Sequence, residues 1–151
     1  MTLLFNGVNN HSYKKGKLEL HLSMTTKQFD VMVQDRPGEV AHIAEALTKG
    51  AVNIRGIATE RSTSPLLHII TDDEVSTRKA LTNAGIHYQE KEVFVVSLMN
   101  KPGELAKITK KLARGGVNIG SLFILAGGKD QEEIAIGVDK PAEAQKLLDY
   151  S

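Results

Sequence analysis

One stretch of the sequence occurs twice, and this duplication constrains the fold more than any other feature. The letters PGE, an apolar pattern and the letters VNI stand at residues 37–54 and again at residues 102–119. The offset is constant at 65 residues (102 − 37 and 119 − 54), and ten of the 23 positions in 35–57 are identical in 100–122. A match at a fixed period indicates a repeated structural unit. Because two copies are too few for a solenoid, the sequence predicts a duplicated domain.

The composition of this chain of 151 residues excludes several kinds of function. A net charge of +1 gives no field strong enough to favour nucleic acid or an anionic membrane. Aromatic residues make up 5% and Trp is absent, which leaves little for stacking on bases. The absence of Cys excludes disulfides, thiol catalysis and Cys-ligated metals. No apolar run reaches the roughly 18 residues of a spanning helix and no signal-peptide pattern is present, so we expect a cytoplasmic protein.

Residues 1–26 form a predicted N-terminal leader that differs from the repeats. Turn-forming and basic residues come first, and Leu18, Leu20 and Leu22 then alternate with polar residues. This alternation is the period of a half-buried strand. Met24 is also a plausible natural start, which would make the leader an extension, and a loose chain end is the simpler expectation.

From Phe29 the chain follows the order β-α-β-β-α-β. Alternating apolar residues predict the strands, and an i, i+3, i+4, i+7 stripe predicts the first helix. Asp72 or Asp73 caps the second helix, which Gly85 ends, and Gly56 marks a bulge. The predicted elements cover, in order, residues 29–33, 37–50, 52–57, 67–71, 72–85 and 86–90.

The second copy repeats this order but stops after its second helix. Its elements cover residues 93–98, 105–112, 117–125, 134–138 and 141–148, and the segment 93–98 is apolar on both faces. The sequence therefore predicts an α+β protein with antiparallel sheets and helices on one face, divided into domains at 27–91 and 92–151. Domains of this size bury little surface alone. Since no flexible spacer joins them, we expect them to share a sheet or an interface.

The repeated junction between first strand and first helix offers groups that suit a small ligand. Gly38 and Gly103 have no Cβ, so a ligand can approach the backbone closely. The helix start presents free N–H groups that attract a carboxylate or phosphate. Asn53 and Asn118 begin the next strand with amide groups that donate to a carboxylate or accept from an ammonium. A free amino acid needs both kinds of partner.

The duplicated Pro-Gly-Glu-Val/Leu-Ala-x-Ile pattern, followed by Gly-x-Val-Asn-Ile within β-α-β-β-α-β, resembles the ACT domain. The resemblance covers residues 27–151. The chain resembles in particular small cytoplasmic proteins with two ACT domains in tandem. It implies two ferredoxin-like domains, of which the second lacks its own fourth strand at the C-terminus. It also implies binding of amino acids at interfaces between ACT domains and allosteric regulation of an enzyme or transporter, without catalysis.

The resemblance assigns ligand contacts to the residue two before the Pro and to the Asn of Val-Asn-Ile. These residues are Asp35 with Asn53 and Asn100 with Asn118, and the wider predicted site adds Gly38, Ile54, Gly103, Leu105 and Ile119. The second copy fits the Asn-and-Asn pattern of serine-binding ACT domains. In the first copy, Asp35 favours an ammonium and repels a carboxylate. Some members of the family carry a His four residues before the Pro, and this chain has Val33 and Leu98 at these two positions. We therefore expect the tighter site in the second copy.

Two functions remain open. One is a sensor that binds a free amino acid and signals to a partner; the alternative is a regulatory or structural subunit that docks on an enzyme of amino-acid metabolism without its own ligand. The His residues at 11, 21, 42, 68 and 87 have no ligand spacing, and no Ser/His/Asp set can be assembled. We thus expect no enzyme activity, metal or cofactor. The segment 117–125 is a long apolar edge strand and predicts a homodimer.

The missing fourth strand leaves one edge of residues 93–98 unpaired, although the segment is apolar on both faces. Residues 17–23 have the only spare strand pattern, so one hypothesis is that the leader supplies the missing strand. The alternative is that residues 86–90 and 93–98 form one continuous strand that both domains share, while the leader stays loose.

Deletion of residues 1–23 tests the leader hypothesis. Unpaired backbone groups beside an apolar core cost roughly 1–3 kcal/mol each, so loss of a pairing strand should lower the melting temperature or change the oligomeric state. Thermal melting and sedimentation of the truncated and full-length chains measure both. If neither property changes, the leader has no structural role.

Overall fold

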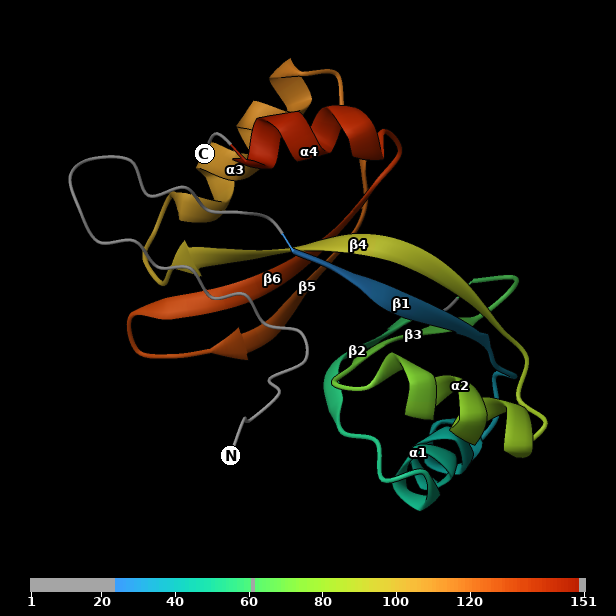
Figure 1. Ribbon diagram of the computed structural model, residues 1–151. Coiled ribbons are helices and arrows are strands. Elements are labelled where there is room, and N and C mark those ends of the chain that lie inside the picture. Colours follow the sequence, from blue (N-terminus) through green and yellow to red (C-terminus); the bar gives the residue numbers. More distant parts are fainter. Residues whose placement is uncertain (1–23, 61, 150–151) are drawn as a thin grey trace, which may run out of the picture.

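The computed structural model describes residues 24–60 and 62–149, and Figure 1 shows their arrangement. A sheet crosses the middle of the molecule, with one pair of helices at each of two opposite sides. The elements are β1 (Met24–Met32), α1 (Glu39–Lys49), β2 (Ile54–Glu60), β3 (Leu66–Thr71), α2 (Glu74–Asn83), β4 (Tyr88–Met99), α3 (Glu104–Arg114), β5 (Ile119–Gly127), β6 (Gln131–Val138) and α4 (Pro141–Asp149).

The described strands form one antiparallel sheet in the order β2-β3-β1-β4-β6-β5. We call residues 24–91 the first half and residues 92–149 the second half. The first half has the complete ferredoxin-like order, with β4 beside β1, while the second half uses the end of β4 as its own first strand. The predicted fold class, two βαββαβ-type units with helices on one face of each, is confirmed.

β4 serves both halves, and its pairing with β1 takes the place of the missing fourth strand of the second half. It runs without interruption from Tyr88 to Met99, so the alternative of one continuous shared strand is confirmed. The free edge of the second half at Val93–Val95 is paired with Met24–Thr26 of β1. The leader hypothesis concerns residues 17–23, which lie outside the described residues.

Two predicted bounds differ from the structure. β1 begins at Met24 and not after the leader bound at residue 26, because its first residues pair with β4. The division between residues 91 and 92 falls inside β4. Both differences arise because pairing with a distant strand, which local sequence does not reveal, decides where these strands begin and end.

The pairing of β1 with β4 relates the halves by a pseudo-twofold axis. Lys27 lies opposite Glu92 in the register, and the two residues are each other's counterparts in the repeat (92 − 27 = 65). Their side chains form an ion pair of 3.4 Å. The axis passes between them, so the same surface of each half meets its own copy.

Each half buries its own core between the helices and one face of the sheet. Leu47 of α1 and Leu81 of α2 are fully buried in the first core, and Leu112 of α3 and Leu148 of α4 are buried in the second. Burial of such a side chain stabilises the fold by about 1.5–3 kcal/mol. The predicted stripes of α1 and α3 therefore face the cores from Ile43 and Ile108 onward, while their first residues, Val40 and Leu105, are 44% and 40% exposed.

A third core lies between the halves, on the faces of the sheet that carry no helix. Ile70 of β3, Val93 of β4 and Phe123 of β5 belong to it, and the outer strands β2 and β5 contact each other. Val93 and its neighbour Phe94 are both buried, as predicted for a strand covered on both faces. The sheet thus closes over its own helix-free face.

A buried polar cluster lies beside this third core. Asp30 Oδ1 accepts hydrogen bonds from His68 Nδ1 and Gln28 Nε2, both at 2.6 Å, and Lys91 Nζ lies 2.6 Å from Oδ2. Burial raises the pKa of the Asp30 carboxyl, but the contacts with His68, Lys91 and Gln28 outweigh burial and hold the pKa below its ordinary value. Ser121 of the second half donates to Gln28 Oε1 at 2.9 Å, so the cluster connects the two halves.

Both first helices begin with a glycine in the left-handed region. Gly38 has φ 94° before α1 and Gly103 has φ 95° before α3. A Cβ at either position would meet no atom within 4 Å. The backbone conformation, and not crowding, therefore requires glycine at both helix starts.

Gly38→Ala and Gly103→Ala should each lower the free energy of unfolding by about 1–2 kcal/mol, because a Cβ is strained at positive φ. Gly127→Ala is the matched control, since Gly127 also has open space around it but is not among the glycines with positive φ. Urea unfolding measures all three variants. A loss at Gly127 equal to that at Gly38 would contradict this account.

Asp30→Asn should destabilise the protein by about 2 kcal/mol at neutral pH, because hydrogen bonds to a buried charge are lost. A carboxyl whose folded-state pKa is lowered stabilises the fold above its unfolded pKa and loses this effect as pH falls through the folded value. The variant should therefore show a weaker loss of stability in acid than the wild type. Glu92→Gln, at an exposed ion pair, is the control and should change stability little.

Candidate functional site

The loop between β1 and α1 contains Asp35 and Gly38 of the predicted site. The Glu39 carboxylate, at the first position of α1, accepts from Arg36 Nε at 2.6 Å and from the backbone N–H of Gln34 at 3.3 Å. These hydrogen bonds, with that of Arg36 first, lower the pKa of the Glu39 carboxyl. A negative charge of the protein thus already lies at this helix start, where it interacts favourably with the helix dipole.

The loop between β4 and α3 repeats this arrangement with different contacts. Glu104 accepts from Lys107 Nζ at 2.7 Å, which lowers the pKa of its carboxyl. Asn100 turns towards the β5–β6 hairpin, where its Nδ2 donates to Gly128 O at 3.0 Å and its backbone amide donates to Asp130 O at 2.9 Å. The predicted ligand residue Asn100 is therefore held by the hairpin of its own half.

The two strand entries are held identically. The backbone N–H of Asn53 donates to Asp72 Oδ1 at 3.1 Å, and the backbone N–H of Asn118 donates to Asp139 Oδ1 at 2.9 Å. In return, the backbone carbonyl of each Asn accepts from the backbone N–H of its Asp at 3.1 Å. Both Asn residues are exposed. The backbone of each Asn is fixed by the fold, while its side chain lies at the surface.

The structure does not bring the predicted pairs together within one copy. Asp35 and Asn53 lie beyond opposite ends of α1, and Asn100 and Asn118 lie beyond opposite ends of α3. Each helix has 11 residues, which corresponds to a length of about 16 Å. This length exceeds that of a free amino acid.

The remaining predicted residues have different environments. Leu105, in the first turn of α3, is 40% exposed and available to a ligand or partner. Ile54 and Ile119 are partly buried against the first and second cores, respectively. Both isoleucines therefore contribute mainly to packing at the strand entries.

The start of β2 instead approaches the second half. Arg55 forms an ion pair of 2.6 Å with Glu133 of β6, and a Cβ at Gly56 would lie 2.8 Å from Leu125 of β5. Glu133 pairs with Ala126, at the base of the same hairpin that holds Asn100. The entry of the first half and the loop of the second half thus approach one hairpin.

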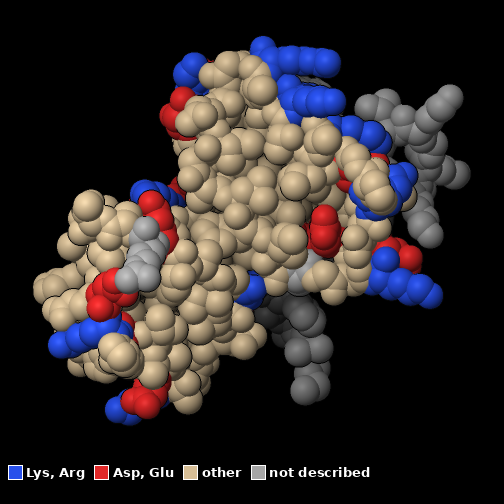
Figure 2. Space-filling view, turned by 180° about the vertical axis from the view of Figure 1, so that it is seen from behind, with Lys and Arg blue, Asp and Glu red and all other residues tan. Residues whose placement is uncertain are grey.

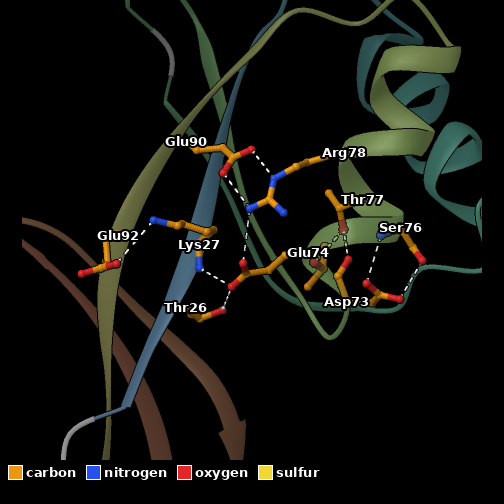
Figure 3. Close-up of polar contacts among 10 residues, drawn as sticks. Thr26, Lys27, Asp73, Glu74, Ser76, Thr77, Arg78, Glu90 and Glu92 are labelled. Atoms are coloured by element: carbon orange, nitrogen blue, oxygen red, sulfur yellow. Dashed lines mark hydrogen bonds and ion pairs between the residues drawn. The ribbon is translucent and has the colours of Figure 1, made fainter. Parts of the chain in front are cut away.

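A second polar cluster joins α2 to β1 and β4 (Figure 3). β3 ends at Thr71, and Glu74 of α2 accepts from the backbone amide of Lys27, one residue beyond the last β1–β3 pair. Arg78 donates hydrogen bonds to both Glu90 of β4 and Glu74. The contacts with Glu90, and then with Glu74, raise the pKa of the Arg78 guanidinium, and the hydrogen bond from Arg78 lowers the pKa of the Glu90 carboxyl. Figure 3 also shows the predicted cap, with Ser76 donating to the side chain of Asp73. These carboxylates are structural.

Sequence reasoning missed the residues at the junction of the halves, namely Gln28, Arg55, His68, Ser121 and Glu133. Strand alternation assigns them to a solvent-facing side. The available signal was indirect: residues 93–98 are apolar on both faces, which requires a cover for the helix-free side. Within the described residues, no group of three or more His, Asp and Glu could hold a metal ion.

A groove of about 340 Å³ lies outside the predicted site, between α1 and α2. Its wall on α1 consists of His42, Glu45, Ala46 and Lys49, and Ala80 lies on the α2 side.

The described residues also contain no helix long and apolar enough to cross a membrane.

Solved structures share this fold. A Bacteroides thetaiotaomicron protein, BT0572, has a TM-score of 0.76 and 22% identity, over 83% of this chain and 88% of that one. The regulatory subunit of aspartate kinase from Thermus thermophilus, in ligand-free form, has a TM-score of 0.58 and 17% identity over 86% and 97%. Clostridium acetobutylicum aspartate kinase has a TM-score of 0.52 and 14% identity over 93% of this chain and 37% of the enzyme. At these identities the likeness concerns the fold.

The family comparison covers most of the chain. A search of curated proteins found no match to the sequence. The model of the ACT domain pair matches residues 24–148, a range that extends from the start of β1 into α4. The resemblance inferred from the duplicated motif is therefore confirmed, and the chain belongs to the ACT domain pair family.

Proposed function

We propose that this protein is a regulatory module that binds a free amino acid at the junctions between its two halves and passes the signal to a partner. The observation that carries the proposal is the match of the ACT domain pair over both halves, each with the same left-handed glycine and exposed strand-entry Asn. The module has no catalytic activity of its own and acts in the cytoplasm.

Each site is composed of residues from both halves. Asn53 and Ile54 of the first half act with Asn100, Gly103 and Leu105 of the second. The geometry that supports this grouping is the approach of β2 to the β5–β6 hairpin, through Arg55 and Glu133. The pseudo-twofold relation then groups Asp35 and Gly38 with Asn118 and Ile119.

The two sites differ in charge. Asn53 and Asn100 supply neutral amides that serve either end of a zwitterion. Asp35 places a carboxylate at the other site, where it attracts an ammonium and opposes the carboxylate of the ligand. The site with Asn100 is therefore the tighter one for a free amino acid.

The chain forms a homodimer and acts on an enzyme of amino-acid metabolism. β5 is one of the two outer strands of the described sheet, its segment Ile119–Gly127 contains no charged residue, and Ile124 is 65% exposed. Uncharged edge strands tend to pair with a second chain. The regulatory subunits of aspartate kinase among the similar structures support an enzyme of that kind as the partner.

A thermal-shift screen of the common amino acids tests the function. A ligand at about 100 times its dissociation constant adds roughly 2.7 kcal/mol to the free energy of unfolding, which raises the melting temperature measurably. We expect one small set of amino acids to do so. If none raises it, the alternative of a docking subunit without its own ligand replaces the proposal.

Two variants test how the site is composed. In the cross-half grouping, Asn53→Ala removes a contact of the tighter site and weakens binding more than Asn118→Ala. Calorimetric titration with the amino acid from the screen measures both, and Lys79→Ala, at an exposed residue of α2, serves as a control outside the site. A greater loss with Asn118→Ala would support the grouping within one copy instead.

A further inference from the structure

The helices α1 and α3 are counterparts that share their core positions but not their outer positions. Their inward residues are the same, since Ile43 and Leu47 of α1 correspond to Ile108 and Leu112 of α3. On the other side, the α1 residues His42, Glu45, Ala46 and Lys49, of which Ala46 is buried, correspond to the α3 residues Lys107, Lys110, Lys111 and Arg114. One outer stripe carries balanced charge and the other carries four cations.

The four cations of α3, which we call the basic stripe, lie on one side of the helix. Their spacing of i, i+3, i+4 and i+7 places them on neighbouring turns. Lys107 pairs with Glu104 at 2.7 Å and its side chain remains 73% exposed. Lys110 and Arg114 are exposed, and no carboxylate of residues 24–60 or 62–149 forms a salt bridge with either. Figure 2 shows Lys and Arg side chains gathered at the end of the molecule where α3 and α4 lie.

The fold itself does not require the basic stripe. The sister helix α1 packs the same core without it. The surfaces beside the two stripes have also diverged: Gly50 faces Ala80 and leaves the groove between α1 and α2, whereas Gly115 faces the larger Leu147. The second half thus presents basic side chains at the helix positions that line an open groove in the first half.

We propose that the basic stripe is a docking surface for an acidic surface of another protein. Four cations on one helix attract a partner of opposite charge and accelerate its approach. An acidic protein surface fits better than nucleic acid, because α3 and α4 contain no aromatic residue for stacking on bases. This inference does not depend on amino-acid binding.

The test uses the full chain and a labelled synthetic amphipathic helix whose polar positions are Glu. Fluorescence anisotropy gives its affinity, and amide NMR shifts locate it. We expect shifts along α3 and an affinity that falls with added salt. Lys110→Glu, which copies Glu45 of the sister helix, should weaken binding roughly tenfold, because it replaces attraction by repulsion.

Lys79→Glu on α2 is the matched control, with the same change of charge on an exposed residue of the other helix layer. It should retain the affinity of the wild type, and thermal melting verifies that both variants fold. Equal losses in the two variants, or shifts along α1 in place of α3, would overturn the proposal. So would tighter binding of single-stranded DNA or of vesicles containing phosphatidylserine than of the acidic helix.

Discussion

The structure depends on the pairing of β1 with β4. β1 lies between β3 and β4, and β4 continues from one half into the other, so this pairing completes the first half and joins it to the second. It also places the helix-free faces of both halves against each other, where the third core forms. Two units that each bury too little surface alone thereby become one structure.

This arrangement explains why charged residues are buried at the centre of a protein with little net charge. When the helix-free faces meet, Asp30 and Gln28 on β1 lose contact with water and require partners. His68, Lys91 and Ser121 supply them, and Ser121 comes from the other half. Because an unpaired buried charge is costly, the cluster favours one relative position of the halves over others.

Local sequence predicts the parts of this fold that depend on neighbouring residues. The apolar stripes of the helices, the cap by Asp73, and the bulge at Gly56, where the β2–β3 register shifts, are confirmed for this reason. The burial of Gln28 and Asp30 was not predicted, because strand alternation cannot distinguish solvent from a second protein face. The relation between Asn53 and Asn100 also depends on how the sheet closes, which no local pattern contains. The resemblance therefore identified the two loops as a repeated pair, while the approach of β2 to the β5–β6 hairpin became visible only in the structure.

The axis between Lys27 and Glu92 has a consequence for how such a protein changes. Two identical halves around a twofold axis would form a symmetric dimer, in which every mutation appears at both sites at once. When the halves are joined in one chain by a single strand, the symmetric contact is kept, but a mutation changes only one half. One loop can then acquire Asp35 while the other keeps Asn100, and one helix can become basic while its sister retains a groove. The continuous β4 thus preserves the interface of a symmetric dimer within one chain, while the surfaces of the two halves can differ.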